Sequence, residues 1–298
     1  TSKAAGMRAV SVKRRKAASL TEDQAAALRS LVAAPKFELI PLSNVIERVA
    51  ELPPASIVTV TASPSHGIEA TLALAETLAT YGHSPVPHLS AHMIFDRTHL
   101  REVLDRCAAS GFSRAFVVGG DAKDKGEFHD GLALLRAMDE SGHQFTEIGV
   151  PSYPEGHVDI PGDRLLEVLL EKQRYASYMT TQMCFNPGAI VGWIWAMRVS
   201  GVTLPVHLGT PGVAELTKLM TISARIGIAD SARYLKKNRK MVGSLLTPGK
   251  FGPDALLVDM AETFTNPDAA VQALHLFTFN QVSATLEWQQ RMLADLGG

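Results

Sequence analysis

The stretch THLREVLDRCAASGFSRAFVVGG, residues 98–120, contains a helical pattern followed at once by a strand pattern. Apolar residues recur with helical spacing over 98–111, and Gly111 stands where such a helix is expected to end. Residues 114–120 form a short apolar run with β-branched side chains, which is typical of a buried strand. This stretch therefore predicts one helix that leads directly into one strand.

The same alternation of strand and helix recurs along most of the chain. The other expected strands are 36–42, 56–62, 84–89, 146–150, 177–183, 203–209 and 274–279, and the other expected helices are 68–82, 128–142, 164–176 and 212–227. A strand followed by a helix, repeated eight times in about 250 residues, is the pattern of a (β/α)8 barrel. The sequence therefore predicts a single TIM-barrel domain of the α/β class.

An open, doubly wound sheet is the alternative architecture. That fold usually carries a glycine fingerprint directly after its first strand, and residues 37–46, FELIPLSNVI, contain no glycine. No linker rich in Pro, Gly or Ser divides the 298 residues. We therefore expect an N-terminal tail over residues 1–20, one catalytic domain over 21–298, and an elaborated connection over 229–265 before the last strand.

The charges and the cysteines limit the possible partners. Lys plus Arg total 29 and Asp plus Glu total 30, so no overall field favours nucleic acid or an anionic membrane. The longest apolar run, residues 189–197, is far shorter than the roughly 20 residues of a membrane helix. Cys107 and Cys184 match neither a disulfide framework nor a metal pattern, which favours a reducing compartment such as the cytoplasm.

Polar residues at the ends of the expected strands form the candidate site, because active sites of TIM barrels lie at the C-terminal ends of the strands. These residues are Glu38, Thr61, His88, Asp121, Tyr153, His157, Gln182, Asn280 and Gln281. Glu38 differs from the others because Phe37 and Leu39 flank it within an apolar strand. Burial there favours the protonated carboxyl and would make Glu38 a proton donor near neutral pH; pairing with a nearby cation is the alternative.

His88 and His92 are four residues apart, a spacing that can bind a metal ion when both residues lie on a helix. Here the segment PHLSAHM, residues 87–93, follows a proline and closes a strand. We therefore expect no metal site at these histidines.

Eight short motifs occur at the strand ends in a fixed order. They are FELIPL (37–42), VTVTASP (58–64), PHLS (87–90), VVGGD (117–121), YPEGH (153–157), TTQMCF (180–185), PVHLGTPG (205–212) and LFTFN (276–280). In order and residues they resemble the methylenetetrahydrofolate reductase family over about residues 36–285. The resemblance implies reduction of 5,10-methylenetetrahydrofolate to 5-methyltetrahydrofolate, with a nicotinamide nucleotide, NADH or NADPH, as the electron source.

The resemblance also implies roles for individual residues. The methylene bridge must open to an iminium ion before its carbon accepts hydride, and opening requires a proton on the departing nitrogen. Glu38 matches the family's proton donor, and Asp121 matches an aspartate whose charge would stabilise the cation. Gln182 matches a glutamine that hydrogen-bonds the pterin, and Phe185 would offer a stacking surface. The residues expected to bind the folate are Gln182, Phe185, Asn280 and Gln281.

In most of the family an FAD mediates the transfer, and the resemblance implies that its site is degraded in this chain. Gly119 stands where the family has a flavin-holding arginine before Gly-Asp, and Lys172 is the remaining candidate cation on the helix expected over 164–176. The retained positions expected to contact a cofactor are Thr61, His88, Gly120, Tyr153 and His157, together with Gly119 and Lys172. We therefore expect little or no bound FAD, with NADH or NADPH in or near the vacated groove passing hydride directly to the folate.

Two alternatives stay open at this point. The same reaction could run through bound FAD, or the barrel could bind folate as a partner subunit without reductase chemistry. The presence of Glu38, Asp121 and Gln182 argues against a pure binding protein, because binding alone needs no buried proton donor.

Overall fold

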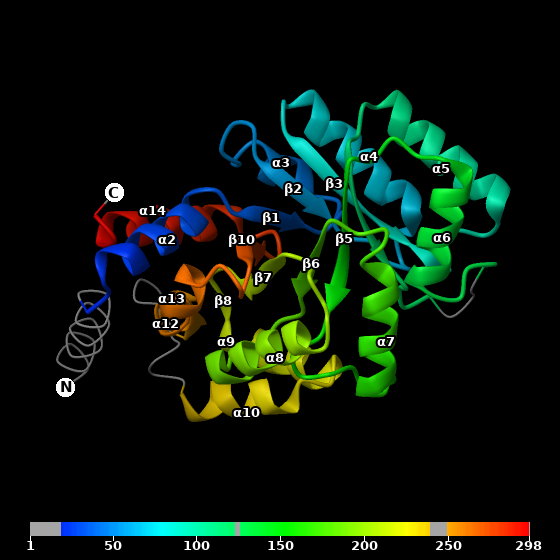
Figure 1. The fold of residues 1–298 in the computed structure, drawn as a ribbon. Coiled ribbons are helices and arrows are strands. Elements are labelled where there is room, and N and C mark those ends of the chain that lie inside the picture. Colours follow the sequence, from blue (N-terminus) through cyan, green and yellow to red (C-terminus); the bar gives the residue numbers. More distant parts are fainter. Residues whose placement is uncertain (1–18, 123–125, 239–248, 298) are drawn as a thin grey trace.

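The computed structural model of this chain describes residues 19–122, 126–238 and 249–297. Eight parallel strands close into a barrel in the order β1-β10-β7-β6-β5-β4-β3-β2 (Figure 1). They are β1 (Lys36–Leu39), β2 (Ile57–Val60), β3 (Ser84–Ser90), β4 (Arg114–Val118), β5 (Glu147–Ser152), β6 (Tyr178–Thr181), β7 (Val206–Pro211) and β10 (Val271–Phe277). Each predicted strand overlaps one barrel strand, although β3, β5, β7 and β10 extend beyond the predicted ranges, and the predicted TIM barrel is confirmed.

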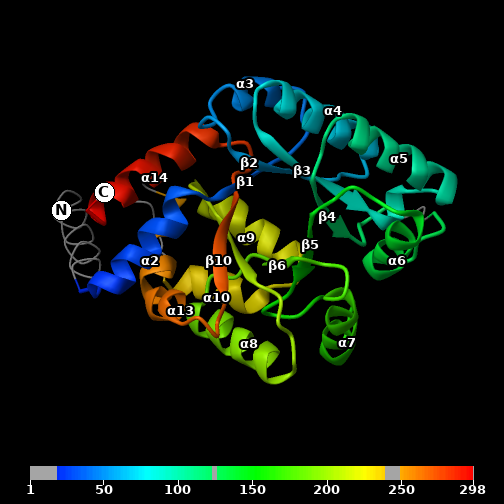
Figure 2. The same cartoon turned by 45° about the horizontal axis from the view of Figure 1, so that its top comes forward.

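Helices surround the barrel, as the two views of the ribbon show (Figures 1 and 2). Those that follow the barrel strands are α3 (Val45–Val49), α4 (Gly67–Thr80), α5 (Arg97–Ala109), α6 (Gly131–Ser141), α7 (Gly162–Lys172), α8 (Pro187–Val199), α9 (Leu216–Arg225) and α14 (Val282–Asp295). The helix expected over 212–227 begins only at Leu216, because β7 continues to Pro211 and residues 214–215 form another strand. The apolar run 189–197 lies within α8, and no helix among the described residues has the length and apolar character of a membrane span.

The first described helix, α2 (Glu22–Ala33), begins at the expected end of the N-terminal tail. Thr21 and Gln24 form a capping box, in which each side chain accepts a hydrogen bond from the backbone of the other residue. In both views α2 lies beside α14, and Arg29 donates a hydrogen bond from Nε to the carbonyl oxygen of Leu296 at 3.2 Å. Residues 1–18 of the expected tail lie outside the described residues.

The connection over 229–265 contains secondary structure that the sequence patterns did not predict. Its described elements are α10 (Ala229–Lys237), β9 (Lys250–Phe251), α12 (Asp254–Asp259) and α13 (Ala261–Thr265). Strand β9 pairs antiparallel with β8 (Ala214–Glu215) outside the barrel. Strands β8 and β9 have two residues each and are too short to produce a recognisable alternation, which is why they were not predicted. Outside this connection, one further short element, the 3-10 turn η1 (Ala91–Met93), follows β3.

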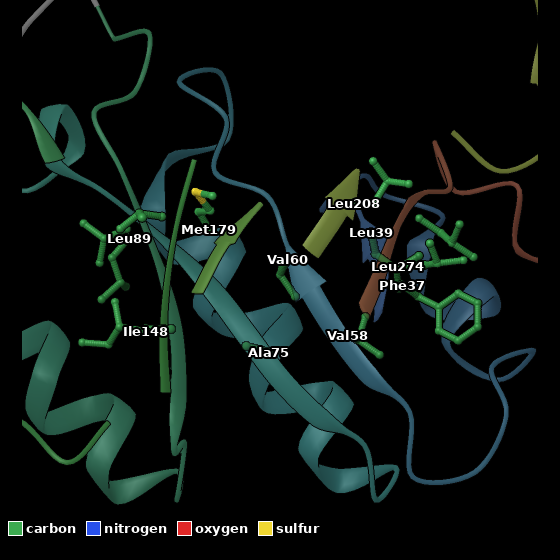
Figure 3. Packing of buried hydrophobic residues seen from close by; sticks show 14 of the residues in the cluster. Phe37, Leu39, Val58, Val60, Ala75, Leu89, Ile148, Met179, Leu208 and Leu274 are labelled. Atoms are coloured by element: carbon green, nitrogen blue, oxygen red, sulfur yellow. The ribbon is translucent and has the colours of Figure 1, made fainter. Parts of the chain in front are cut away.

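Side chains on the strands alternate between the helices and the barrel interior. Figure 3 shows Phe37 and Leu39 of β1 among the apolar side chains of the main core. Because successive side chains of a strand point to opposite faces, Lys36 and Glu38 of the same strand point into the barrel. The interior thus contains charged groups, whereas the interior of a TIM barrel is usually filled by branched apolar side chains.

An ion-pair cluster occupies the N-terminal end of the barrel interior. Lys36 Nζ lies 2.6 Å from Glu147 Oε1, and Arg114 Nε lies 3.1 Å from Glu147 Oε2. The Lys36 ammonium also lies 4.1 Å from the centroid of the Tyr178 ring. Burial lowers the pKa of Lys36, and the hydrogen bond that its ammonium donates to Glu147 opposes this shift. Interacting charges therefore fill the end of the barrel opposite to the candidate site.

Candidate active site

The predicted site residues gather at the C-terminal ends of the strands, as the barrel requires. Glu38 lies in β1 and His88 in β3, and the other strand-end residues follow their strands directly or within the next loop. These others are Thr61 after β2, Gly119, Gly120 and Asp121 after β4, Tyr153 and His157 after β5, Gln182 and Phe185 after β6, and Asn280 and Gln281 after β10.

Glu38 has a hydrogen-bonding partner inside the barrel, so its setting is not wholly apolar. Its neighbours Phe37 and Leu39 face the helices, while its own side chain lies inside the barrel beside His275 of β10. A hydrogen bond of 2.8 Å joins His275 Nε2 and Glu38 Oε2, and the His275 and Glu38 side chains are 3% and 15% exposed. The carboxyl therefore has a titratable partner that sequence reasoning missed.

His275 could have been recognised from the alternation of its strand. It lies between Leu274 and Leu276, which are both fully buried in the main core. A polar residue between two outward-facing apolar residues must point into the barrel. The pattern, however, does not tell which of the seven other strands supplies its partner.

His88 lies in the same interior region as Glu38. Its ring stacks on Phe116 with 4.7 Å between the centroids, and its Nε2 atom is shielded from solvent without a hydrogen-bond partner among the described residues. Burial lowers the pKa of His88 to about 4, and the charge of Glu38 opposes that shift. The ring is therefore neutral at pH 7 and can accept or donate a hydrogen bond without carrying charge.

His92, by contrast, has a structural contact. Its Nε2 donates a hydrogen bond to the backbone carbonyl of His129 at 2.8 Å, which links the segment after β3 to the segment before α6. In the described ranges, no group of three or more His, Cys, Asp or Glu side chains is arranged to hold a metal ion.

Asp121 and Tyr153 lie close enough for their charges to interact. Asp121 is exposed at the end of β4, and burial together with the nearby charge of Asp121 raises the pKa of the Tyr153 hydroxyl to about 12. The ring of Tyr153 meets that of His157 edge to face, with centroids 5.1 Å apart. This part of the site therefore presents one carboxylate and one protonated hydroxyl.

The side-chain oxygen of Gln182 lacks a hydrogen-bond donor among the described residues. Its backbone N–H donates to the carbonyl oxygen of Ser152 at 2.8 Å, which fixes the residue at the end of β6. Its side-chain Oε1 is shielded from solvent and has no hydrogen-bond partner among the described residues. Buried polar atoms are nearly always paired, so this oxygen is available to a donor on a bound molecule or a water.

Phe185 does not offer the expected stacking surface. It is 1% exposed and belongs to a second core, made of Met183, Phe185, Ala214, Leu219, Ile228, Leu235 and Phe251. Its ring meets Phe251 edge to face with 5.2 Å between the centroids. The prediction of a substrate contact is therefore corrected, because Phe185 holds the segment after β6 against α9, α10 and β9.

Asn280 uses its side-chain amide within the protein. Its Oδ1 accepts a hydrogen bond from the backbone N–H of Ile40, and its Nδ2 donates to the carbonyl of Ile40, both at 2.9 Å. Asn280 has a φ of 61° and Phe279 a φ of 48°, both in the left-handed region that few residues other than glycine adopt. The amide thus joins the ends of β1 and β10 rather than being free to bind the folate.

Gln281 remains accessible to a ligand. It lines a cavity of about 340 Å³ between the loops that follow β1 and β10, together with Asn44 and Arg48. Thr61 is half-buried at the end of β2, where its carbonyl oxygen accepts a hydrogen bond from the Thr71 hydroxyl. Both residues therefore keep side chains at the candidate site.

Lys172, the last residue of α7, lies near Gly131, which also adjoins Gly119. A Cβ atom at Gly131 would lie 3.5 Å from Lys172 Nζ and 3.4 Å from the backbone nitrogen of Gly119. Lys172 is 9% exposed and forms no ion pair or hydrogen bond from its ammonium group within the described residues. Burial lowers its pKa, and the charge of Asp130 opposes the shift.

The comparison with family models decides the family. The model of the methylenetetrahydrofolate reductases matches residues 23–292, which is most of the chain. This chain belongs to the methylenetetrahydrofolate reductase family. The resemblance drawn from the eight motifs is therefore confirmed.

Solved structures similar to this family member are distant in sequence. An uncharacterized protein from Clostridium thermocellum, which binds two copies of 5-methyl-5,6,7,8-tetrahydrofolic acid, is 13% identical with a TM-score of 0.55, and the match covers 88% of this chain and 95% of that one. Tryptophan synthase from M. tuberculosis is also 13% identical, with a TM-score of 0.45 and coverage of 92% and 96%. At such identity the first likeness shows the shared fold and nothing more.

The two glycines at the end of β4 are expected to respond differently to substitution. Gly120 has a φ of 94°, and a Cβ there would lie 2.0 Å from Ser90 Oγ, whereas a Cβ at Gly119 would meet its nearest atom, the Gly131 nitrogen, at 3.9 Å. We expect Gly120→Ala to lower the free energy of unfolding by about 2 kcal/mol. Gly119→Ala should change it by less than about 0.5 kcal/mol. Urea unfolding measures the free energy of unfolding of both variants. An equal loss in the two variants would contradict the positive φ and the close contact at Gly120.

Proposed function

We propose that this protein reduces 5,10-methylenetetrahydrofolate to 5-methyltetrahydrofolate with NADH or NADPH, by direct hydride transfer and without a tightly bound flavin. The observation that carries the proposal is the Glu38 carboxyl, held 2.8 Å from His275 inside the barrel of a family member. A proton donor at this place is what opening of the methylene bridge requires.

The neighbouring groups have chemistry that suits the same reaction. Asp121 supplies a negative charge that would stabilise the iminium cation formed when the bridge opens. The unpaired Oε1 of Gln182 would accept a hydrogen bond from an N–H of the pterin. Hydride would then pass from the nicotinamide to the iminium carbon, so that one proton and one hydride enter the substrate and NAD(P)⁺ leaves.

The residues present do not fit a tightly bound FAD. Gly119 presents no cation, and Lys172 is buried with the charge of Asp130 nearby. Each lost charge-assisted contact to a pyrophosphate costs about 1.5–3 kcal/mol, so two or three such losses weaken dinucleotide binding by orders of magnitude. We therefore assign the hydride directly to the nicotinamide nucleotide, which would bind in or near the vacated groove.

A folate-binding barrel without reductase activity is the second candidate function. It is favoured by the Clostridium thermocellum protein, which shares the fold and binds 5-methyltetrahydrofolate. The two candidates differ in their need for Glu38, because a pure binding protein has no proton to transfer.

Flavin content and activity of the purified protein test the proposal together. We expect little flavin absorbance, oxidation of NADH or NADPH that depends on methylenetetrahydrofolate, and a rise in melting temperature with the nicotinamide nucleotide but not with FAD. About one FAD per chain would refute direct transfer. Binding of folate without any nucleotide oxidation would support the second candidate.

Position 119 offers a matched pair of variants for the same question. A side chain fits there, since the nearest atom to a Cβ is 3.9 Å away. We expect Gly119→Arg to increase the stabilisation of the protein by FAD, because it returns a cation to the place from which the family's arginine is missing. Gly119→Gln adds a similar volume without charge and should leave the response to FAD unchanged.

A further inference from the structure

Glu38 and His275 form a buried acid–base pair whose members come from neighbouring strands. Hydrogen bonding joins His275 Nε2 to Glu38 Oε2 at 2.8 Å, and His275 is 3% exposed. The His275 ring lies against Phe277, with 4.9 Å between the ring centroids. The imidazole is therefore packed in place with Nε2 beside one oxygen of the carboxyl, and the other oxygen of Glu38 has no hydrogen-bond partner among the described residues.

The other titratable groups that face this pair cannot supply a proton near neutral pH. Burial lowers the pKa of His88 on β3 to about 4 and that of His207 on β7 to about 2, with the charge of His275 adding to both shifts. Lys36, below Glu38 on β1, is bonded to Glu147. Within the described residues, His275 is the titratable side chain that is hydrogen-bonded to Glu38.

The proposed reaction consumes one proton from solvent in each turnover. Glu38 gives a proton to the departing nitrogen and becomes a carboxylate, and the nicotinamide gives hydride to carbon. An isolated glutamic acid has a pKa of about 4.3 and would be almost fully ionised at pH 7. A carboxyl that must donate at neutral pH therefore needs a source that returns its proton.

We propose that Glu38 and His275 hold the catalytic proton jointly, with His275 as the positioning residue that keeps Glu38 supplied. This inference rests on the proposed function. One proton shared by the pair gives either an imidazolium with a carboxylate or a neutral imidazole with a carboxylic acid. The two forms differ only in the place of a proton along one 2.8 Å hydrogen bond. The shared proton moves from His275 Nε2 to Glu38, the carboxylic acid so formed gives it to the departing nitrogen and becomes a carboxylate, and solvent later returns one proton to the imidazole.

The variant His275→Gln tests the pair, because a glutamine amide can still donate a hydrogen bond to Glu38 but cannot take up or release a proton. We expect kcat to fall about 100-fold at pH 8 and about 10-fold at pH 6, since the acid form of a lone carboxyl decreases with rising pH. His207→Gln is the matched control, because His207 is also a buried interior histidine but stacks on Tyr178. It should keep the wild-type shape of the pH profile. An unchanged profile in His275→Gln, or the same change in both variants, would overturn the proposal.

A measurement without turnover separates this inference from the proposed function. NMR of ¹⁵N-labelled histidine rings follows the Nε2 signal of His275 in the wild type and in Glu38→Gln. We expect the substitution to move this signal, because Nε2 loses the carboxyl with which it shares a proton. An Nε2 signal that does not move would refute the shared proton. A wild type without reductase activity but with a signal that moves would refute the proposed function and leave the coupled pair in place.

Discussion

Replacement of Glu38 by Gln is expected to reduce kcat for methylenetetrahydrofolate reduction by about 10²- to 10⁴-fold, the usual contribution of a general acid. Glutamine has nearly the same shape and can still accept the hydrogen bond from His275 Nε2. It has no proton to give to the departing nitrogen, so the bridge would open without assistance. Steady-state oxidation of NADH measures the loss.

The control for this prediction is binding. Thermal stabilisation by NADH and by 5-methyltetrahydrofolate should be the same in Glu38→Gln as in the wild type, because the variant leaves the shape of the site intact. Activity that survives the substitution would refute the assignment of Glu38 as proton donor. Loss of both binding and activity would instead assign Glu38 a role in holding the ligand.

Replacement of Phe185 by Ala is expected to lower the free energy of unfolding by about 3–5 kcal/mol. Phe185 is 1% exposed and fills the centre of the second core against Phe251, so truncation leaves a cavity that its neighbours cannot fill. The melting temperature should fall by roughly 5–15 °C. Phe185→Leu retains most of the volume and should lose less than about half as much stability.

Kinetics distinguish this structural role from the substrate contact expected from the sequence. Below the melting temperature of each variant, Phe185→Leu should keep a wild-type KM for methylenetetrahydrofolate. A variant with unchanged stability and a raised KM would place Phe185 against the substrate after all.

The fold was predictable from the sequence because each unit of the barrel carries its own local signal. Residues 114–118 are one example, because a short apolar run directly after a helical pattern is typical of a buried strand. A closed barrel then places all strand ends on one face, so the location of Glu38, Asp121 and Gln182 followed without knowledge of any contact.

The contacts within the site were not predictable, since they join residues that are distant in the sequence. Glu38 and His275 are separated by 237 positions, and the alternation of β10 shows only that His275 points inward. Asn280 has the amide of a typical ligand-binding residue, but pairing with Ile40 is decided by the register between two loops. Phe185 was misplaced because α9, α10 and β9, which bury it, give weak sequence signals.

Strand β10 serves two parts of the molecule at once. His275 directs its imidazole to Glu38, and two residues later Phe277 packs against the second core that contains Phe185 and Phe251. The rings of His275 and Phe277 touch each other, so an unbroken series of contacts leads from the carboxyl to the helices α9 and α10. Strand β10 therefore supports both the Glu38–His275 pair and the packing of α9 and α10. A substitution that loosens the packing of these helices is expected to disturb the pair as well.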